Sequence, residues 1–365
     1  MSALFKTRIL PGNRIRVLVV DDSVVIRRLV THALSEDPML EVAGFASDGA
    51  IGLARIPQVN PDVITLDIEM PGMDGLEMLR RVRKEYPRIR VIMFSTLTER
   101  GAAVTLEALA LGADDYVTKA SNAGSLDRSL TNLRAELIPR IRQFFQIAAV
   151  PAPKLAVASP RSTAEERAKP RLRSERAVVA IGVSTGGPNA LSVIVPQFPA
   201  DFPLPILIVQ HMPPLFTRLL AERLQQGTRL QVQEAAEGSL LSPGKILIAP
   251  GDHHMQVRTG TGAESVVLNQ GPPENSCRPS VDVLFRSVGQ VYGGAVISAI
   301  LTGMGQDGLR GVETLKAQGA YVIAQDEESS VVWGMPGAIA TAGLADSVLP
   351  LNRVVPAILD QIKKG

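Results

Sequence analysis

The feature that most constrains this 365-residue chain is an alternation of short apolar runs with helical patterns, which occurs twice. In the first half, five strand-like runs are each followed by a helical pattern: Arg16–Val20, Glu41–Ala46, Asp62–Asp67, Arg90–Phe94 and Asp115–Val117. Five βα units predict a doubly wound parallel sheet with helices on both faces. In such a sheet, functional side chains gather beyond the carboxyl ends of the strands.

Polar side chains stand at those strand ends. Asp21 and Asp22 close the first strand and Asp67 closes the third. Ser95 ends the fourth strand and Lys119 follows the fifth. Carboxylates at one edge repel one another unless a cation lies among them, and oxygen ligands favour Mg²⁺. A nearby lysine and hydroxyl suit a phosphoryl group on one carboxylate. The alternative is that the first two acids only cap a helix and the lysine is a solvated charge.

The segment Arg14–Arg142 resembles the response-regulator receiver domain, through the motifs VLVVDDS, LDIEMPGMDG, FST and DDYVTK. The resemblance implies that Asp67 accepts a phosphoryl group beside a bound Mg²⁺. It implies these further roles: Asp21, Asp22 and the Glu69 carbonyl as Mg²⁺ ligands with Asp67, Ser95 as the switch hydroxyl, Tyr116 as the coupled aromatic residue, and Lys119 as the phosphate-contacting cation.

One position departs from that family's pattern. Receiver domains usually carry proline after this lysine, often with a cis peptide bond, whereas Ala120 follows Lys119 here. A cis bond before a residue other than proline costs about 2.5–4 kcal/mol. We therefore expect a trans bond and a differently placed loop.

Residues 143–176 are expected to form a flexible linker. The stretch from Pro151 to Arg176 has no sustained period and carries seven basic and three acidic residues. A solvated tether is the interpretation favoured by this composition, and contact with nucleic acid or an acidic surface is the alternative. Even a flexible tether keeps two domains at a high effective concentration.

The second alternation begins with Val178–Val183, which runs into a Gly-rich turn holding Ser184. A helix that starts near Pro188 can offer free N–H groups to an anion beside this hydroxyl. His211 and Asp307 also follow strand-like runs that end in sharp turns. If the three strands are neighbours, the imidazole can take the serine proton and the carboxylate can orient the imidazole. The pattern predicts acyl transfer.

Each member of this trio has a structural alternative: a turn serine, a histidine packed in an interface and a helix-capping acid. GVSTG fits the elbow of α/β-hydrolases, but those enzymes place the acid before the histidine in the chain. A dinucleotide fingerprint is excluded because Ser184 stands where the second glycine is required.

Two other chemical candidates are weaker. His253 and His254, with Asp252, suggest a metal site, but adjacent strand residues point to opposite faces. Cys277 has no histidine near it in the sequence and is expected to be an inert thiol. Four short runs are expected to form an antiparallel insertion: Leu230–Gln233, Lys245–Ala249, Met255–Arg258 and Ser265–Asn269.

The segment Val178–Ile362 resembles the chemotaxis-type protein-glutamate methylesterase/glutamine deamidase family (CheB), through IGVSTGGP, VQHMPP, RPSVDVLF, LTGMGQDG and VVWGMPGAIA. We place the catalytic domain at 177–365, after a receiver domain at 14–142. The resemblance implies Ser184 as nucleophile, His211 as base and Asp307 as its orienting acid. Thr185 and the Met304 backbone are implied helpers at the oxyanion site.

The same resemblance implies demethylation of glutamate γ-methyl esters, and deamidation of some glutamines, on chemoreceptors. A histidine kinase is the implied phosphodonor, and the unphosphorylated receiver is expected to cover the active site. No cofactor is expected for ester hydrolysis. The rival hypothesis is a non-catalytic response regulator whose output domain binds a partner.

Composition narrows the partners and the location. No apolar run approaches the roughly 18 residues of a membrane span, so we expect no membrane insertion. Aromatic residues make up 4% of the chain, which disfavours base stacking on nucleic acid. One cysteine and no secretory signal are typical of a cytoplasmic protein.

Overall fold

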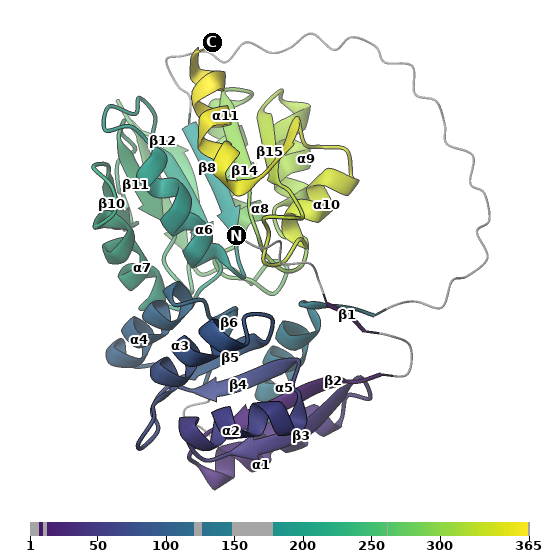
Figure 1. Cartoon of the computed structure of the whole chain (residues 1–365). Coiled ribbons are helices and arrows are strands. Elements are labelled where there is room, and N and C mark those ends of the chain that lie inside the picture. The colour runs from purple at the N-terminus through teal and green to yellow at the C-terminus, as the bar shows by residue number, and fades with distance from the viewer. Residues whose placement is uncertain (1–6, 10–12, 120–125, 148–177, 261, 364–365) are drawn as a thin grey trace, which may run out of the picture.

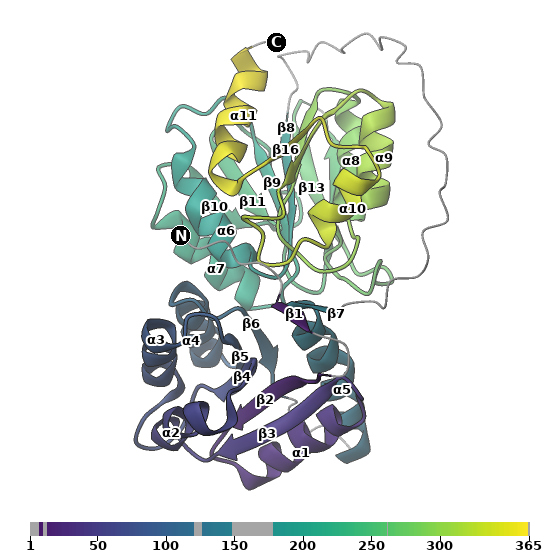
Figure 2. The same cartoon turned by 45° about the vertical axis from the view of Figure 1, so that its right-hand side comes forward.

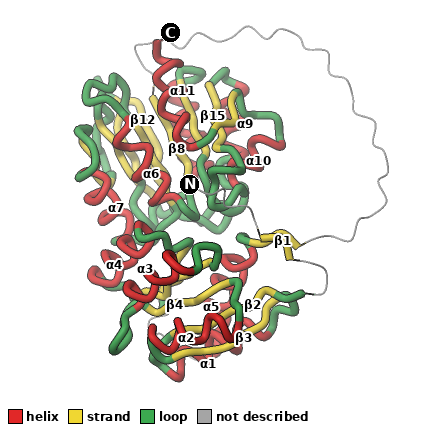
Figure 3. The backbone as a smooth tube through the Cα atoms, in the orientation of Figure 1, coloured by secondary structure: helices red, strands yellow, loops and turns green. Residues whose placement is uncertain are grey.

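The computed structural model describes residues 7–9, 13–119, 126–147, 178–260 and 262–363, which form two α/β units stacked on each other (Figures 1 and 2). In each unit helices flank a central sheet on both faces (Figure 3). Among the described residues, no helix has the length and apolar character needed to cross a membrane.

The N-terminal unit is a five-stranded parallel sheet with the strand order β3-β2-β4-β5-β6. Its strands are β2 (Ile15–Val20), β3 (Leu40–Ala46), β4 (Val63–Asp67), β5 (Arg90–Ser95) and β6 (Asp115–Thr118). Its helices are α1 (Val24–Ser35), α2 (Gly49–Val59), α3 (Gly75–Glu85), α4 (Glu99–Ala110) and α5 (Leu126–Arg142). This confirms the predicted doubly wound arrangement.

Alternation along the buried strand β2 distributes its side chains between two cores. Val17 and Val19 pack with α1 and α5, whereas Leu18 and Val20 pack with α2, α3 and α4. Strands buried on both faces are typical of parallel sheets, whose crossover helices cover each side. Side-chain caps begin four of the helices, from Ser23, Asp48, Asp74 and Thr98.

A separate two-stranded pair closes this unit. Strand β1 (Thr7–Ile9) pairs in parallel with β7 (Phe145–Ile147), and Phe144 just before β7 is fully buried in the receiver core. Most of the expected linker, from residue 148 to residue 176, lies outside the described residues, as does Ala120. The domain boundaries 14–142, 143–176 and 177–365 stay a prediction.

The C-terminal unit is a seven-stranded parallel sheet with the order β10-β11-β9-β8-β14-β15-β16. Its strands are β8 (Val178–Val183), β9 (Ile206–Gln210), β10 (Gln231–Glu234), β11 (Lys245–Ile248), β14 (Val296–Ile300), β15 (Tyr321–Gln325) and β16 (Ser347–Leu349). Helices α6 (Gly187–Ile194), α7 (Phe216–Gln225) and α11 (Leu351–Lys363) cover one face. Helices α8 (Val281–Tyr292), α9 (Leu309–Ala317) and α10 (Met335–Thr341) cover the other face.

The expected antiparallel insertion was half right. Strands β12 (His254–Thr259) and β13 (Glu264–Asn269) do form an antiparallel hairpin. The prediction was wrong for β10 and β11, which extend the main sheet in parallel. The physical reason is visible in β11, where Ile246, Leu247 and Ile248 are consecutive and all buried. A continuous apolar run of this kind suits a strand covered on both faces.

The two units meet through α4 of the first and α6 and α7 of the second (Figures 1 and 2). The Asn189 side chain donates a hydrogen bond to the Leu109 carbonyl at 2.7 Å. The Arg223 guanidinium donates to the Leu106 carbonyl at 2.8 Å. These contacts hold α4 of the N-terminal unit against α6 and α7 of the C-terminal unit.

Candidate active site

Ser184 stands at the point where the connections of the catalytic sheet change direction. Strand β8 has β9 on one side and β14 on the other, so the loops after these strands diverge at the crevice where α/β proteins bind ligands. The Ser184 backbone N–H donates to the Thr302 carbonyl at 3.0 Å. A Cβ added at Gly303 would lie 2.8 Å from the Ser184 Cβ, so only glycine lets these segments approach so closely.

His211 and Asp307 come to this edge from the two strands that flank β8. His211 directly follows β9, and its backbone N–H donates to the Val183 carbonyl at 3.2 Å. Asp307 lies in the turn after β14. The His211 Nε2–H donates to Asp307 Oδ2 at 2.8 Å. The predicted histidine–carboxylate pair therefore forms through Nε2.

The start of α8 holds Asp307 in its ionised form. The backbone N–H groups of Val281 and Asp282 donate to its carboxylate at 2.7 and 3.2 Å. The Ser280 hydroxyl and the Asn275 amide each donate to it at 2.8 Å. Burial alone would raise the Asp307 pKa, but the hydrogen bonds, with the one from His211 the largest, lower this pKa to about 2.

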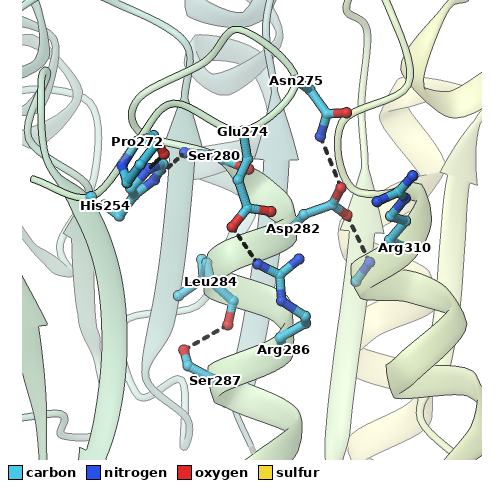
Figure 4. A network of polar contacts seen from close by, with 12 residues as sticks. His254, Pro272, Glu274, Asn275, Ser280, Asp282, Leu284, Arg286, Ser287 and Arg310 are labelled. Atoms are coloured by element: carbon cyan, nitrogen blue, oxygen red, sulfur yellow. Dashed lines mark hydrogen bonds and ion pairs between the residues drawn. The ribbon is translucent and has the colours of Figure 1, made fainter. Parts of the chain in front are cut away.

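These supporting residues were missed in the sequence because they carry no catalytic spacing of their own. Figure 4 shows Asn275 reaching from its loop to Asp282 on α8, with Ser280 next to His254 just before this helix. The Asn275 amide bridges the two acids, donating to Asp282 at 2.9 Å as well as to Asp307. Asp282 also accepts from the Gly311 backbone N–H at 2.7 Å. The signal that could have found them is the polar run before the helix that begins at Val281.

The charge state of His211 reflects opposing influences. Burial alone would lower the pKa of His211, but hydrogen bonds to Asp307 and Cys277 raise this pKa to about 10. The Cys277 sulfur lies 3.5 Å from His211 Nδ1. Among the described residues, Ser184 makes no hydrogen bond to the ring, although both line one cavity. Cys277, expected to be an ordinary thiol, occupies the face of the imidazole that a nucleophile would use.

That cavity has a volume of about 440 Å³ and is walled by both units. Ser184, His211 and Met304 contribute from the catalytic side, and Tyr116 and Arg140 from the receiver side. Thr185 lines the same cavity but is buried. Its hydroxyl lies 3.2 Å from Gln143 Oε1 and 3.4 Å from Asp115 Oδ2 across the interface and can donate its one proton to either oxygen.

An aromatic pair completes the contact between the units. The Tyr116 ring stacks on Phe216 of α7, with centroids 5.0 Å apart and planes at 7°. Tyr116 is buried, and burial raises its pKa. The Arg140 guanidinium lies over the Tyr116 ring, 5.7 Å from its centroid, and forms an ion pair with Asp115 at 2.9 Å. Tyr116, the predicted receiver aromatic residue, thus lines the cavity that also contains Ser184 and His211.

The receiver acids also converge as predicted. One carboxylate oxygen from each of Asp21, Asp22 and Asp67 lies within 4.8 Å of the others. Lys119 Nζ contacts Asp67 at 2.7 Å and Asp21 at 3.2 Å. Burial raises the pKa of Asp67 to about 6, against the opposing effect of Lys119. Three oxygen ligands so close, two of them buried, fit a hard divalent cation such as Mg²⁺.

The two remaining residues predicted for the receiver site are Ser95 and Glu69, and the structure shows what each of them contacts. The Ser95 hydroxyl bonds to the Gly101 carbonyl at 3.2 Å and to the Thr105 hydroxyl at 2.5 Å, both on α4. Glu69 is exposed, and its backbone N–H donates to Asp67 at 3.4 Å. Ser95 therefore lies in contact with the helix that touches the catalytic unit.

The weaker metal candidate has structural partners instead. His254 Nε2–H donates to the Pro272 carbonyl at 3.0 Å, and its Nδ1 accepts from the Ser280 backbone N–H at 3.2 Å (Figure 4). Asp252 pairs with Arg278. His254 therefore fastens the loop before α8.

Comparison with known proteins agrees with this architecture. The family model "CheB methylesterase" matches residues 179–358, and "Response regulator receiver domain" matches residues 17–131. A protein-glutamate methylesterase/protein-glutamine glutaminase of Trichodesmium erythraeum is 50% identical over 351 residues, covering 96% of this chain and 99% of that protein. One of Nocardioides sp. is 49% identical over 358 residues, covering 97% of each.

A solved structure gives the same answer for the catalytic unit. The CheB methylesterase catalytic domain of Thermotoga maritima is 42% identical, with a TM-score of 0.50, and the match covers 52% of this chain and 98% of that one. Family models, full-length relatives and fold all agree. The chain belongs to the CheB family of protein-glutamate methylesterases/protein-glutamine glutaminases, with a receiver domain in front of a methylesterase domain.

Proposed function

We propose that this protein hydrolyses glutamate γ-methyl esters on chemoreceptors, and deamidates certain glutamines, under the control of phosphorylation at Asp67. The observation that carries the proposal is the His211–Asp307 pair, 2.8 Å apart, on the two strands that flank Ser184. A serine, a histidine and a buried carboxylate at adjacent strand ends are the parts that acyl transfer requires. The family relationship supports the choice of substrate.

The reaction follows from these three groups. His211 Nδ1 accepts the Ser184 proton while the oxygen attacks the ester carbonyl, and Asp307 stabilises the imidazolium through Nε2. The imidazolium returns its proton to the leaving methoxide, so methanol departs and an acyl-serine remains. Water then attacks this acyl group by the same route and releases the glutamate. With a glutamine side chain the leaving group is ammonia.

Backbone donors around the serine are the expected oxyanion site. The start of α6 follows Ser184, and Met304 lies in the same cavity. Thr185, the other implied helper, is engaged by Gln143 and Asp115 of the receiver. Opening of the interface therefore both exposes the cavity and releases the Thr185 hydroxyl.

The receiver supplies the control. Asp67 accepts the phosphoryl group from a histidine kinase, and Lys119 contacts the same carboxylate. Asp21, Asp22 and Asp67, with the Glu69 carbonyl, would hold Mg²⁺, which supplies positive charge for the incoming phosphoryl group.

The Ser95 contacts connect phosphorylation to the interface. A hydroxyl drawn toward a phosphoryl group on Asp67 gives up its bonds to Gly101 and Thr105 on α4. The same helix offers the carbonyls that Asn189 and Arg223 hold. When α4 loses its contacts with Ser95, its contacts with Asn189 and Arg223 weaken, and the population of the protein shifts toward an open form.

We place this reaction in the cytoplasm, where receptor methyl esters and the kinase are accessible without membrane insertion of this chain. Nucleic acid has no part in the proposal.

The decisive test measures methanol release from a methylated chemoreceptor, with a small acyl phosphate as phosphodonor. Ser184→Ala should abolish release, whereas Ser192→Ala, a matched exposed serine on α6, should not. Full activity in Ser184→Ala would refute the triad. Phosphorylation-dependent binding to a partner with no hydrolysis by the unmodified protein would support the non-catalytic alternative.

A further inference from the structure

Two groups of metal-ligating side chains occur in the described part of the chain, and one of them is not explained by phosphorylation. It consists of His211, Cys277 and Asp307, whose nearest ligand atoms all lie within 4.8 Å of one another. The other is the receiver cluster of carboxylates. The ligand types differ, because thiolate and imidazole favour zinc-like cations whereas carboxylates alone favour Mg²⁺.

The spacing of the two softer ligands fits one ion. Cys277 Sγ and His211 Nδ1 are 3.5 Å apart. In a tetrahedral site, Zn–N and Zn–S bonds of about 2.1 and 2.3 Å place the two donor atoms roughly 3.6 Å apart. The distance between this nitrogen and this sulfur is therefore the distance expected for two ligands of one tetrahedral zinc ion.

Asp307 has the supporting position rather than that of a ligand. It bonds to His211 Nε2 at 2.8 Å, and one of its carboxylate oxygens lies within 4.8 Å of the Cys277 sulfur. Metal-binding histidines commonly donate their second N–H to a carboxylate, which fixes the ring and makes the ligating nitrogen more basic. The orientation that suits Asp307 for catalysis is therefore the one that presents Nδ1 to a cation.

Cys277 is held beside the imidazole by a tight turn. Glu274 and Cys277 exchange backbone hydrogen bonds of 3.1 and 2.8 Å. The two residues between them, Asn275 and Ser276, have φ values of 52° and 62°, the pattern of a type I′ turn. Glu274 is tied to Arg286 of α8 at 2.6 Å (Figure 4). The sulfur is therefore placed by built structure and not by a free loop.

The remaining coordination positions face the reaction space. Ser184 lines the same cavity of about 440 Å³ as His211 and Cys277. Two protein ligands leave two positions of a tetrahedral ion for water or for the serine hydroxyl. An ion there occupies the nitrogen that must accept the Ser184 proton.

We propose that His211 and Cys277 form an inhibitory site for a thiophilic divalent cation, with Zn²⁺ as its representative. The proposal rests on the proposed function, because inhibition follows from the role of His211 as the base. Binding releases to solvent the proton on the Cys277 sulfur and any proton on His211 Nδ1, so that the two ligands are a thiolate and a neutral imidazole. The cation stops the reaction without touching the receiver, so the protein has a second control independent of phosphorylation.

The first test needs no catalysis. Co²⁺ is added to the full-length protein and to Cys277→Ala, and thiolate-to-cobalt charge-transfer absorption is recorded. Because Cys277 is the one cysteine in the sequence, any such band reports this sulfur. We expect the band in the unmodified protein, its loss in Cys277→Ala and its displacement by Zn²⁺. Absence of the band in the unmodified protein overturns the proposal, whether or not the protein hydrolyses esters.

The second test measures inhibition. Zn²⁺, with Mg²⁺ as the comparison, is titrated into methanol-release assays, and each variant is scored against its own metal-free rate. We expect Zn²⁺ to inhibit, a chelator to reverse it, and Cys277→Ala to raise the half-inhibiting concentration at least tenfold. His253→Ala, a control at the other histidine pair, should leave that concentration unchanged. Equal inhibition of Cys277→Ala and the unmodified protein overturns the site.

Discussion

Replacing Arg223 by alanine should release much of the restraint on the unphosphorylated enzyme. The half-buried guanidinium donates a 2.8 Å hydrogen bond to the Leu106 carbonyl near the C-terminal end of α4, where a positive charge also complements the helix dipole. In an open form water solvates both the guanidinium and the carbonyl. The substitution therefore destabilises the closed form alone. A hydrogen bond to a charged group contributes about 1.5–3 kcal/mol.

That free energy converts directly into a rate. Each 1.4 kcal/mol changes an equilibrium constant tenfold, so Arg223→Ala should raise the open population, and the basal methanol-release rate, roughly 10- to 100-fold. The basal rate of the variant cannot exceed the rate of the fully phosphorylated enzyme, in which the open form already predominates. The rate measured with saturating phosphodonor should stay the same, because Arg223 does not line the catalytic cavity.

Arg218 provides a matched control on the same helix. It also reaches α4, pairing with Glu99 at 2.7 Å, but both side chains are exposed. Exposed ion pairs contribute little because water and salt screen them. Arg218→Ala should therefore leave the basal rate nearly unchanged. If both variants raise it equally, or if Arg223→Ala also lowers the phosphorylated rate, the assignment of this contact to the closed state is wrong.

Three further predictions concern the catalytic edge. Asp307→Asn should lower kcat by roughly 10²–10⁴ while the fold persists, because His211 loses the carboxylate that orients it; a small loss in steady-state assays would contradict this. Gly303→Ala should lower kcat because its new Cβ would lie 2.8 Å from the Ser184 Cβ, and circular dichroism should report a folded protein. Finally, the general base works only when deprotonated, and Cys277 helps hold the His211 pKa at about 10. Measured with a chelator present, Cys277→Ala should shift the rising limb of the pH–rate profile to lower pH, and an unshifted limb would count against the contact.

The convergence of the proposed catalytic trio could be predicted because a parallel sheet brings strand ends together. Ser184, His211 and Asp307 are far apart in the chain, but each follows a buried apolar run, and those runs are neighbours in the sheet. The receiver acids were predictable for the same reason. Whatever is placed by strand order and strand direction is accessible to reasoning from periodicity alone.

The contacts made by loops and across the interface were not predictable in this way. Asn275 reaches Asp307 from a turn with two positive φ angles, which no hydrophobic period encodes. The hydroxyl of Thr185, whose oxyanion role stays a prediction, contacts Gln143 in this structure, and packing of one unit on the other decides that partner. Neither unit carries a pattern that specifies the surface of the other.

The β1–β7 pair is a small two-stranded sheet at the end of the receiver unit, separate from its five-stranded sheet. The two strands pair in parallel, with Thr7 opposite Phe145 and Ile9 opposite Ile147, so the first described strand of the chain lies beside the segment that follows α5. The pair therefore ties the first described strand to the end of the receiver unit, next to Phe144, which is buried in the core of that unit.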